Sequence, residues 1–271
     1  MLSLNTNISS LFGALQLNRN TEDISKVSQQ ISSGKRILTA ADDPAGVGIL
    51  STLKAQESSY NAVAKNLSAG KSLLKTAETS LNSQQSTLLQ MKDLATQASS
   101  ALLSADQRAA IVSQFTELKT QLDNAVNTAN LFGQNLTGTA AANVTIQSGI
   151  NSGNTKTITA VKSDAATLAL TAEVLTDPTT SAAAMTALDA AVATVASNQA
   201  IIGTQITGIE KTAESAAANK LNLQSSISSI EDADIPALSA QLAQLQVKQQ
   251  LMVQSLAITN SMPQTLLGLL R

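Results

Sequence analysis

The longest regular feature of the sequence is a ladder of apolar residues at alternating spacings of three and four. Its members are Met185, Leu188, Val192, Val195, Gln199, Ile202, Ile206, Ile209, Ala213, Ala216, Lys220, Leu223, Ile227 and Ile230. Only Gln199 and Lys220 interrupt the apolar pattern. This alternation is the heptad seam of a coiled coil, and so long a helix buries its seam against other helices. The ladder therefore predicts a rod of long helices, with partners supplied by the rest of the chain.

The composition agrees with a rod and excludes several functions. Aromatic residues make up 1% of the 271 residues, whereas a globular core of this size normally uses more rings. The chain has no Cys and no His, which removes thiolate nucleophiles, imidazole bases and most zinc or haem ligation. We therefore expect no catalytic residue, no cofactor and no metal site. The net charge of −2 and the lack of a basic stripe argue against a nucleic-acid partner.

Targeting signals are also missing from the sequence. The N-terminus lacks the basic region and continuous apolar stretch of a cleaved secretory signal. No apolar run approaches the roughly 18 residues of a membrane span, so we expect no membrane insertion. These signs indicate either a cytoplasmic protein or one exported by a route that reads no conventional signal.

Both ends of the chain carry a single apolar stripe. The first stripe has the helical spacing of Leu4, Ile8, Leu11 and Leu15, followed by a shifted series of Leu17, Ile24, Val27 and Ile31. Gly34 is suited to end this helix. The last stripe comprises Ile235, Leu238, Leu242, Leu245, Gln249, Met252 and Leu256, and the tail adds Leu266, Leu267 and Leu270.

The middle of the chain predicts three long helices. Asp43 as a cap and Pro44 at the first helical position start a second heptad series, whose members are Leu53, Tyr60, Leu67, Leu74, Leu81, Leu88, Ala95 and Leu102. Gln56, Gly70 and Gln84 interrupt its three-residue offset. Ser104 and Gln107 form a capping box for a third helix, which ends near residue 130 and returns antiparallel beside the second. The ladder from Met185 belongs to the last of the three.

Residues 134–180 are the only stretch without helical periodicity. Residues 144–146 and 157–159 predict two short strands around a turn between Gly149 and Asn154. The predicted fold is mainly α: a long antiparallel coiled-coil rod with a small β-hairpin, and both termini helical and paired. We assign residues 1–43 and 231–271 to the terminal helical pair and residues 44–230 to the rod, with its hairpin region at about 134–180.

The terminal pair predicts self-assembly. The apolar area of one seam does not offset the conformational entropy lost when both ends are ordered, so we expect these ends to fold against neighbouring subunits. A head-to-tail interface whose rotation does not close generates a helical filament. The residues expected at this subunit interface are Leu4, Ile8, Leu11, Leu15, Ile24, Ile31, Leu238, Leu242, Leu245, Met252, Leu256, Leu266, Leu267 and Leu270.

Several motifs at both ends resemble bacterial flagellin. The N-terminal half has SLNTN at residues 3–7, QQISSGKRI at 29–37 and ADDPAG at 41–46. The C-terminal half has IEDAD at residues 230–234 and PQTLLGLLR at 263–271. These motifs occur in the family's order, and the resemblance covers nearly the whole chain. Residues 134–180 leave room for a hairpin and little else, so the chain resembles a minimal flagellin without large outer domains.

The resemblance implies a structural subunit of the flagellar filament that polymerises with itself into a helical tube used for swimming. It implies export through the flagellar secretion channel and an extracellular location in the flagellum. The partners that it implies are the flagellar cap, hook-junction proteins, an export chaperone and the export apparatus. In the family, the paired terminal helices form the filament core, and the long helices with the hairpin form the next shell.

One segment, LQMKDLA at residues 89–95, resembles the patch that the vertebrate innate flagellin receptor reads. Strongly detected flagellins carry Arg at the position of Gln90 and Glu at the position of Gln114, whereas Leu94 matches the family. The loss of both charges predicts weak detection.

Three alternatives remain at this point. A hook–filament junction protein shares similar ends, and its low abundance in sheared filaments would distinguish it. An enzyme would use Asp42, Asp43 or Glu57 as an acid, but helix capping explains the paired carboxylates, and an inserted zinc peptidase would need His. A soluble coiled-coil adaptor would stay a small oligomer after purification.

Overall fold

The structure, a computed structural model, describes residues 7–172 and 174–269, with side chains as far as residue 261. It divides into two compact units. The terminal unit comprises Met1–Ala55 with Asn222–Arg271, and the central unit comprises Gln56–Leu221. The predicted division at residues 43 and 231 follows helix ends, whereas the boundary between the units falls inside two continuous helices, α2 (Pro44–Ala98) and α4 (Pro178–Glu231).

The predicted mainly α fold is confirmed. Besides α2 and α4, the helices are α1 (Ile8–Ser33), α3 (Ala105–Thr128) and α5 (Ile235–Leu269). The caps read from the sequence are present. Gly34 ends α1 at a φ of 71°, a left-handed conformation that suits glycine. Ser104 and Gln107 form the capping box of α3, and Asp43 accepts a hydrogen bond from the Gly46 amide at 2.8 Å.

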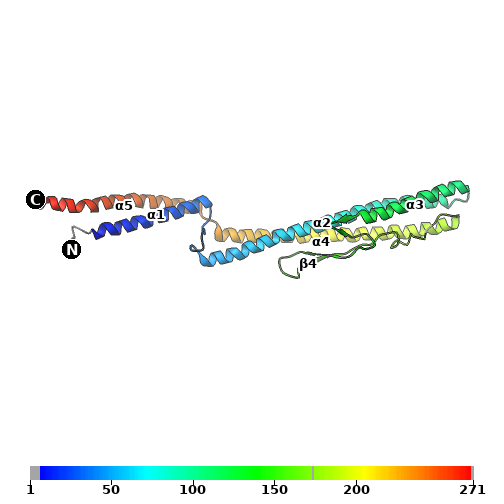
Figure 1. Cartoon of the computed structure of the whole chain (residues 1–271), viewed down its shortest axis with the longest axis horizontal. Coiled ribbons are helices and arrows are strands. Elements are labelled where there is room, and N and C mark those ends of the chain that lie inside the picture. The colour runs from blue at the N-terminus through cyan, green and yellow to red at the C-terminus, as the bar shows by residue number, and fades with distance from the viewer. Residues whose placement is uncertain (1–6, 173, 270–271) are drawn as a thin grey trace. The chain divides into compact units, whose positions relative to one another are not determined.

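In the terminal unit, α1 and α5 run antiparallel and side by side (Figure 1). Asn7 at the start of α1 donates its side-chain amide to the Thr259 carbonyl at 3.1 Å. At the other end of the pair, the amide of Ala233 donates to the carbonyl of Gly34 at 3.0 Å. The free ends of both helices therefore lie at one end of this unit.

In the central unit, α2 runs antiparallel to both α3 and α4. Ser80 donates its hydroxyl to the Ala125 carbonyl on α3 at 2.8 Å, and Lys71 pairs with Glu210 on α4 at 2.8 Å. The core lies where the heptad ladders predict it. Its largest fully buried side chains include Leu67, Leu74, Leu81, Leu88, Leu122, Leu188 and Ile202.

Two of the three interruptions in the α2 ladder, Gly70 and Gln84, have different structural reasons. Gly70 lies under the hairpin, because a Cβ at this position would be 2.7 Å from Cδ1 of Ile146. Glycine therefore permits the close approach of strand and helix. Gln84 is fully buried and donates its amide to the Ser80 hydroxyl at 2.9 Å. Ser80 in turn donates to the Ala125 carbonyl, so this polar pair reaches α3, and a buried polar layer of this kind can fix register in a coiled coil.

The predicted hairpin is also confirmed. Strands β3 (Val144–Gln147) and β4 (Thr155–Ile158) pair antiparallel, with Val144 opposite Ile158. Gln205 on α4 holds the end of β4, because its side-chain oxygen accepts from the Thr159 amide at 2.8 Å and its side-chain amide donates to the Thr159 carbonyl at 3.2 Å. The hairpin is therefore fixed against the helices, as an isolated two-stranded sheet requires.

Three features of the central unit differ from the sequence-based expectation. A second small hairpin, β1 (Asn130–Leu131) with β2 (Gln134–Asn135), follows α3. Leu102 is 95% exposed beyond the end of α2, because it lies in the loop that reverses the chain into α3 and not on the helix seam. The irregular chain after β4 also contributes core residues, namely Val161, Leu168, Leu170 and Leu175.

Candidate functional site

The seam between α1 and α5 changes character along its length. Near Gly34 it contains Ile24, Val27 and Ile31, of which Val27 is buried and the other two are half-buried. Toward the free ends the α1 side of the seam is smaller and more polar, with Gly13 and Asn20, and a Cβ at Gly13 would lie 2.8 Å from Leu256. Asn20 is 2% exposed and bonds to α5. The α1 side of the seam is therefore more apolar at its inner end than at its outer end, whereas α5 contributes apolar residues along its whole described length.

The first predicted stripe of α1 points away from α5. Ile8, Leu11 and Leu15 are 72%, 61% and 53% exposed, and Phe12 beside them is 63% exposed. Their spacing places all four on one face of the helix, opposite the seam. A contiguous apolar patch of this kind marks an interaction surface.

Helix α5 is apolar on more than one side. Its predicted ladder faces α1, with Leu238, Leu242, Leu245, Met252 and Leu256 half-buried along the seam. On the opposite side of α5, Val247, Leu251 and Ile258 are exposed. A helix with apolar residues all round is typical of a buried environment, which the single chain does not provide.

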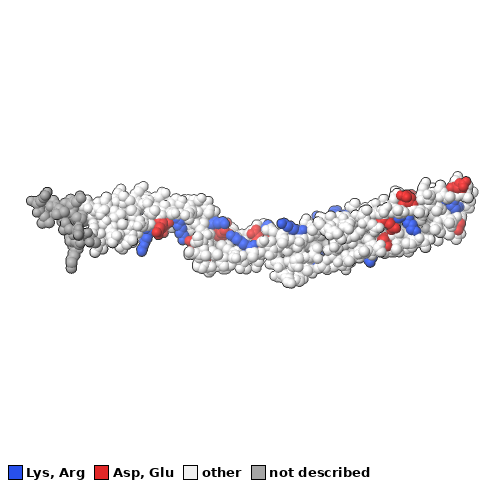
Figure 2. Space-filling model, viewed as in Figure 1, with Lys and Arg blue, Asp and Glu red and all other residues white. Residues whose placement is uncertain are grey.

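Charge is scarce where these faces are exposed. Between Asn7 and Asn18 there is no charged residue, and α5 carries only Lys248 from Ile235 to Ser261. In Figure 2, the described outer part of the pair shows no Lys, Arg, Asp or Glu on the face in view. Burial of this surface against further chains would therefore desolvate few charges.

The structure thus divides the predicted interface residues into two sets. Ile8, Leu11 and Leu15 are available to other chains. Ile24, Ile31 and the five residues of the α5 ladder instead pack between α1 and α5 of the same chain. Leu4, Leu266, Leu267 and Leu270 lie outside the described residues. Sequence reasoning missed Phe12, Val247, Leu251 and Ile258, although their spacings of three, four and seven residues could have revealed a second face on each helix.

The predicted receptor-like residues lie together. Gln90 and Leu94 on α2 and Gln114 on α3 line one open groove of about 540 Å³, together with Ser113, Glu117 and Leu118. Among the described lining residues, Glu117 alone is charged. The structure therefore brings Gln90, Leu94 and Gln114 together on one surface, and their role in receptor recognition stays a prediction.

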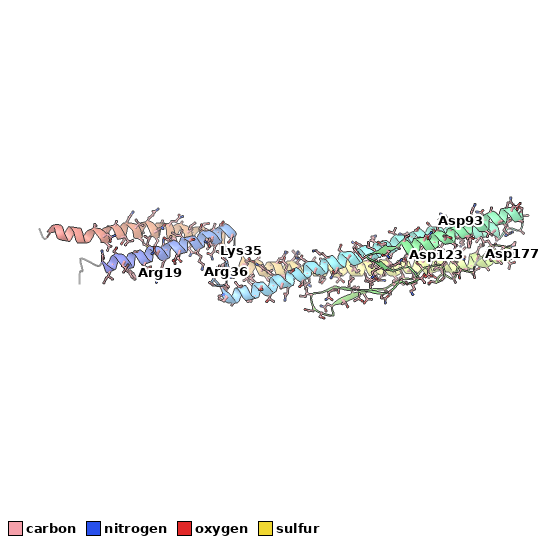
Figure 3. The ribbon with its side chains drawn as sticks, viewed as in Figure 1. Arg19, Lys35, Arg36, Asp93, Asp123 and Asp177 are labelled. Atoms are coloured by element: carbon pink, nitrogen blue, oxygen red, sulfur yellow. The ribbon has the colours of Figure 1, made fainter. Side chains whose placement is uncertain are left out.

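The turn between α1 and α2 is held by a group of charged residues. Lys35 and Arg36 lie at this turn (Figure 3), and both Lys35 and Lys54 place their amines 2.6 Å from the Glu231 carboxylate. These two lysines lower the pKa of Glu231, and Glu231 in return raises the pKa of Lys35. Asp42 accepts hydrogen bonds from the Leu38 and Thr39 amides.

Two of the three carboxylates considered as catalytic acids, Asp42 and Asp43, have structural roles. Asp42 pairs with Lys26 at 2.6 Å, which lowers the pKa of Asp42, and Asp43 caps α2. In the described part of the chain, no cluster of His, Cys, Asp and Glu has the make-up of a metal site. The helices that the structure describes include none with the length and apolar character needed to cross a membrane.

Two family models match the chain. The model of the bacterial flagellin N-terminal helical region matches residues 4–141, and that of the C-terminal helical region matches residues 185–270. The flagellin of Listeria monocytogenes is 29% identical over 99% of both chains. The Caulobacter vibrioides flagellin FljO is 31% identical over 99% of this chain and 98% of its own.

Solved structures agree with these matches. Bacillus cereus flagellin superposes with a TM-score of 0.52 at 28% identity, covering 56% of this chain and 88% of its own. A chain described as a flagellar hook-associated protein of Vibrio parahaemolyticus gives a TM-score of 0.60 over 70% of this chain and 100% of its own. At 18% identity, the second likeness shows a shared fold only.

The helical fold, its unpartnered terminal faces and these matches define a structural protein of the bacterial flagellum. Models of both terminal regions match in the expected order, and relatives align over the full chain. The chain belongs to the bacterial flagellin family. It is a structural subunit of the flagellar filament, an extracellular polymer of copies of itself.

Proposed function

We propose that this flagellin assembles into its filament through two apolar faces that one chain leaves exposed. The first face is Ile8, Leu11, Phe12 and Leu15 on α1, here called the α1 outer stripe. The second is Val247, Leu251 and Ile258 on α5, here called the α5 back face. The observation that carries the proposal is the exposure of both faces on a pair whose outer part, residues 7–18 and 248–261, carries only the charge of Lys248. Leu4, Leu266, Leu267 and Leu270 extend the proposed interface, and Ile24, Ile31 and the α5 ladder support it by holding the pair together.

From family membership we also propose a route of export and a set of partners for this subunit. The subunit travels through the flagellar secretion channel with an export chaperone and the export apparatus, joins the hook-junction proteins, and polymerises beneath the cap for swimming. It acts without catalysis, a cofactor, nucleic acid or membrane insertion. The structural roles of Asp42, which holds the loop before α2, and Asp43, which caps α2, support the proposal that these carboxylates are not catalytic.

A charge placed on the α1 outer stripe tests the proposal. Leu11→Asp would bury a carboxylate at each subunit contact, so we expect seeded elongation to stop. The melting of the central unit should not change, because Leu11 lies outside it. Ser25→Asp puts the same charge on an exposed polar position of α1 and is the matched control. Normal elongation by Leu11→Asp, or equal loss in Ser25→Asp, would contradict the proposal.

The alternative function is that of a hook–filament junction protein. Its only structural support is the fold that this chain shares with the hook-associated chain described above. Mass spectrometry of sheared filaments separates the two functions. A filament subunit is the main component of the sheared material, whereas a junction protein is a trace component.

A further inference from the structure

A buried carboxylate joins three segments of the terminal unit. Glu231 is the last residue of α4, and its side chain is only 9% exposed. Lys35 reaches it from the loop after α1, and Lys54 reaches it from α2, each at 2.6 Å. One acidic group therefore binds two amines that come from different parts of the chain.

The backbone around Glu231 is fixed at the same point. The Arg36 amide donates to the Glu231 carbonyl at 2.7 Å, and Lys35 forms an antiparallel bridge with Asp232. The Arg36 guanidinium donates to the Ile230 carbonyl at 2.7 Å and lies 3.9 Å from Asp43. The loop that leaves α1 thus crosses the junction where α4 ends and the chain turns into α5.

The cluster around Glu231 is better suited to fix the positions of the segments that it joins than to increase the stability of the fold. A buried ion pair is often no more stable than apolar residues of the same volume, but removal of one partner is costly. The best supported use of such groups is to select one arrangement among several. Here the alternatives are other paths of the loop and other starting points of α5 beside α1.

We propose that Glu231, through Lys35 and Lys54, is a positioning residue that sets the geometry in which α1 and α5 leave the junction. Glu231 thereby favours a single arrangement of α1 and α5 over the alternatives. The α1 outer stripe and the α5 back face then have a fixed spacing toward neighbouring chains. This inference rests on the proposed assembly through those two faces.

Distance measurements within the terminal unit test the proposal. The chain has no Cys, so spin labels at Ser28→Cys on α1 and Ser51→Cys on α2 would be the only labels present. Both positions are exposed and belong to the terminal unit. Filaments would be grown from labelled protein diluted with unlabelled protein, and the distance distribution measured by electron–electron double resonance.

We expect one narrow distance distribution in the labelled parent protein and a broader one in Glu231→Gln. Elongation should slow about tenfold, the factor that corresponds to about 1.4 kcal/mol. Lys54→Met removes only one amine and gives the same test if Glu231→Gln folds poorly. In the central unit, Lys71→Met breaks the exposed pair with Glu210 and is the control that should change neither quantity.

Charge reversal provides the rescue. Lys35→Glu, Lys54→Glu and Glu231→Lys together rebuild the cluster with opposite signs, and we expect them to restore the narrow distribution. A distance distribution that stays unchanged in both Glu231→Gln and Lys54→Met overturns the inference. A broader distance distribution in these variants with a normal elongation rate overturns it as well. Failure of the proposed function has a different signature: Leu11→Asp would elongate normally, whatever the distances around Glu231.

Discussion

Asn20 on α1 donates its side-chain amide to the carbonyl of Leu245 on α5 at 3.1 Å, across the middle of the terminal pair. Its own side-chain oxygen is buried and has no hydrogen-bond partner among the described residues. A buried acceptor without a partner costs about 1–3 kcal/mol. The unpaired oxygen of Asn20 therefore lowers the stability of the seam at the place where its α1 side changes from apolar to smaller and more polar residues.

Replacement of Asn20 by Leu should stabilise the terminal pair. Asn20→Leu removes the unpaired acceptor and adds apolar contact, so we expect a gain of about 1 kcal/mol in local unfolding free energy. Hydrogen exchange of the α1 and α5 amides in filaments would measure it. Asn18→Leu, at an exposed position of α1, is the control. Faster exchange in Asn20→Leu would show that the amide bond to Leu245 outweighs the orphaned oxygen.

The free subunit should lose order at its ends. A two-helix pair with so much exposed apolar surface needs neighbours, so we expect both ends to be disordered before assembly. Limited proteolysis of the monomer should remove the chain up to the region between Ser33 and Pro44, and from Asp234 onward. Filaments should resist at the same sites. Equal protection in monomer and filament would rule this out.

The outer part of the pair should be the first to open. Its seam contains Gly13 and Asn20, whereas the inner part contains Val27 and Ile31.

Much of the fold could be read from the sequence, because caps at Gly34, Asp43 and Ser104 depend on local chemistry. The heptad ladders likewise predicted which residues fill the core, as at Leu81 and Leu188.

The direction of the apolar faces could not be read in this way. Ile8 and Ile24 belong to two stripes of one helix, and both stripes are apolar. Which stripe meets α5 depends on the packing of the whole pair, and the structure selects the second, with the small Gly13 completing the seam. The β1–β2 turn could not be predicted from the sequence either. Phe132 has a φ of 55° at this turn, which is rare for a non-glycine residue, so its side-chain type did not indicate the turn.

Acid should weaken the junction around Glu231. Lys35 and Lys54 lower the pKa of Glu231 in the folded chain below the ordinary value of about 4.3. Their stabilising effect is therefore complete above that value and is lost as the pH falls through the lowered folded pKa. Unfolding of the terminal unit in filaments, followed by hydrogen exchange between pH 6 and 3, would measure this loss.

Asp42 contributes to stability with the same sign, because Lys26 lowers its pKa. Comparison of Glu231→Gln with Asp42→Asn separates the two groups. Each variant should reduce the pH dependence, and the double variant should reduce it further. A pH dependence unchanged in both single variants would place the acid-sensitive groups elsewhere.

Recognition by the vertebrate innate flagellin receptor should be weak. Gln90 and Gln114 line the same groove as Leu94. The resemblance described in the sequence analysis implies that these two positions are oppositely charged in strongly detected flagellins. A desolvated charge pair across an interface can be worth about 1.5–7 kcal/mol. We expect Gln90→Arg with Gln114→Glu to increase receptor signalling by monomer in a reporter-cell assay. Strong signalling by the unmodified monomer would contradict this.

The last prediction concerns the seam of the terminal pair. Leu245 is half-buried between α5 and α1, and its carbonyl accepts the Asn20 amide. Leu245→Asp would place a carboxylate among the apolar residues of the seam, at a cost of several kcal/mol for an unpaired charge. The pair would then fail to form in each incoming subunit, so we expect polymerisation to be abolished.

The central unit does not use this side chain, so monomer helicity and melting should remain nearly unchanged. Ser239→Ala, at an exposed position of the same helix, is the control and should polymerise normally. Electron microscopy of seeded reactions would count and measure the filaments. If Leu245→Asp elongates seeds at the rate of the unmodified protein, then formation of the α1–α5 pair is not required for assembly, and the exposed faces alone must carry the subunit contacts.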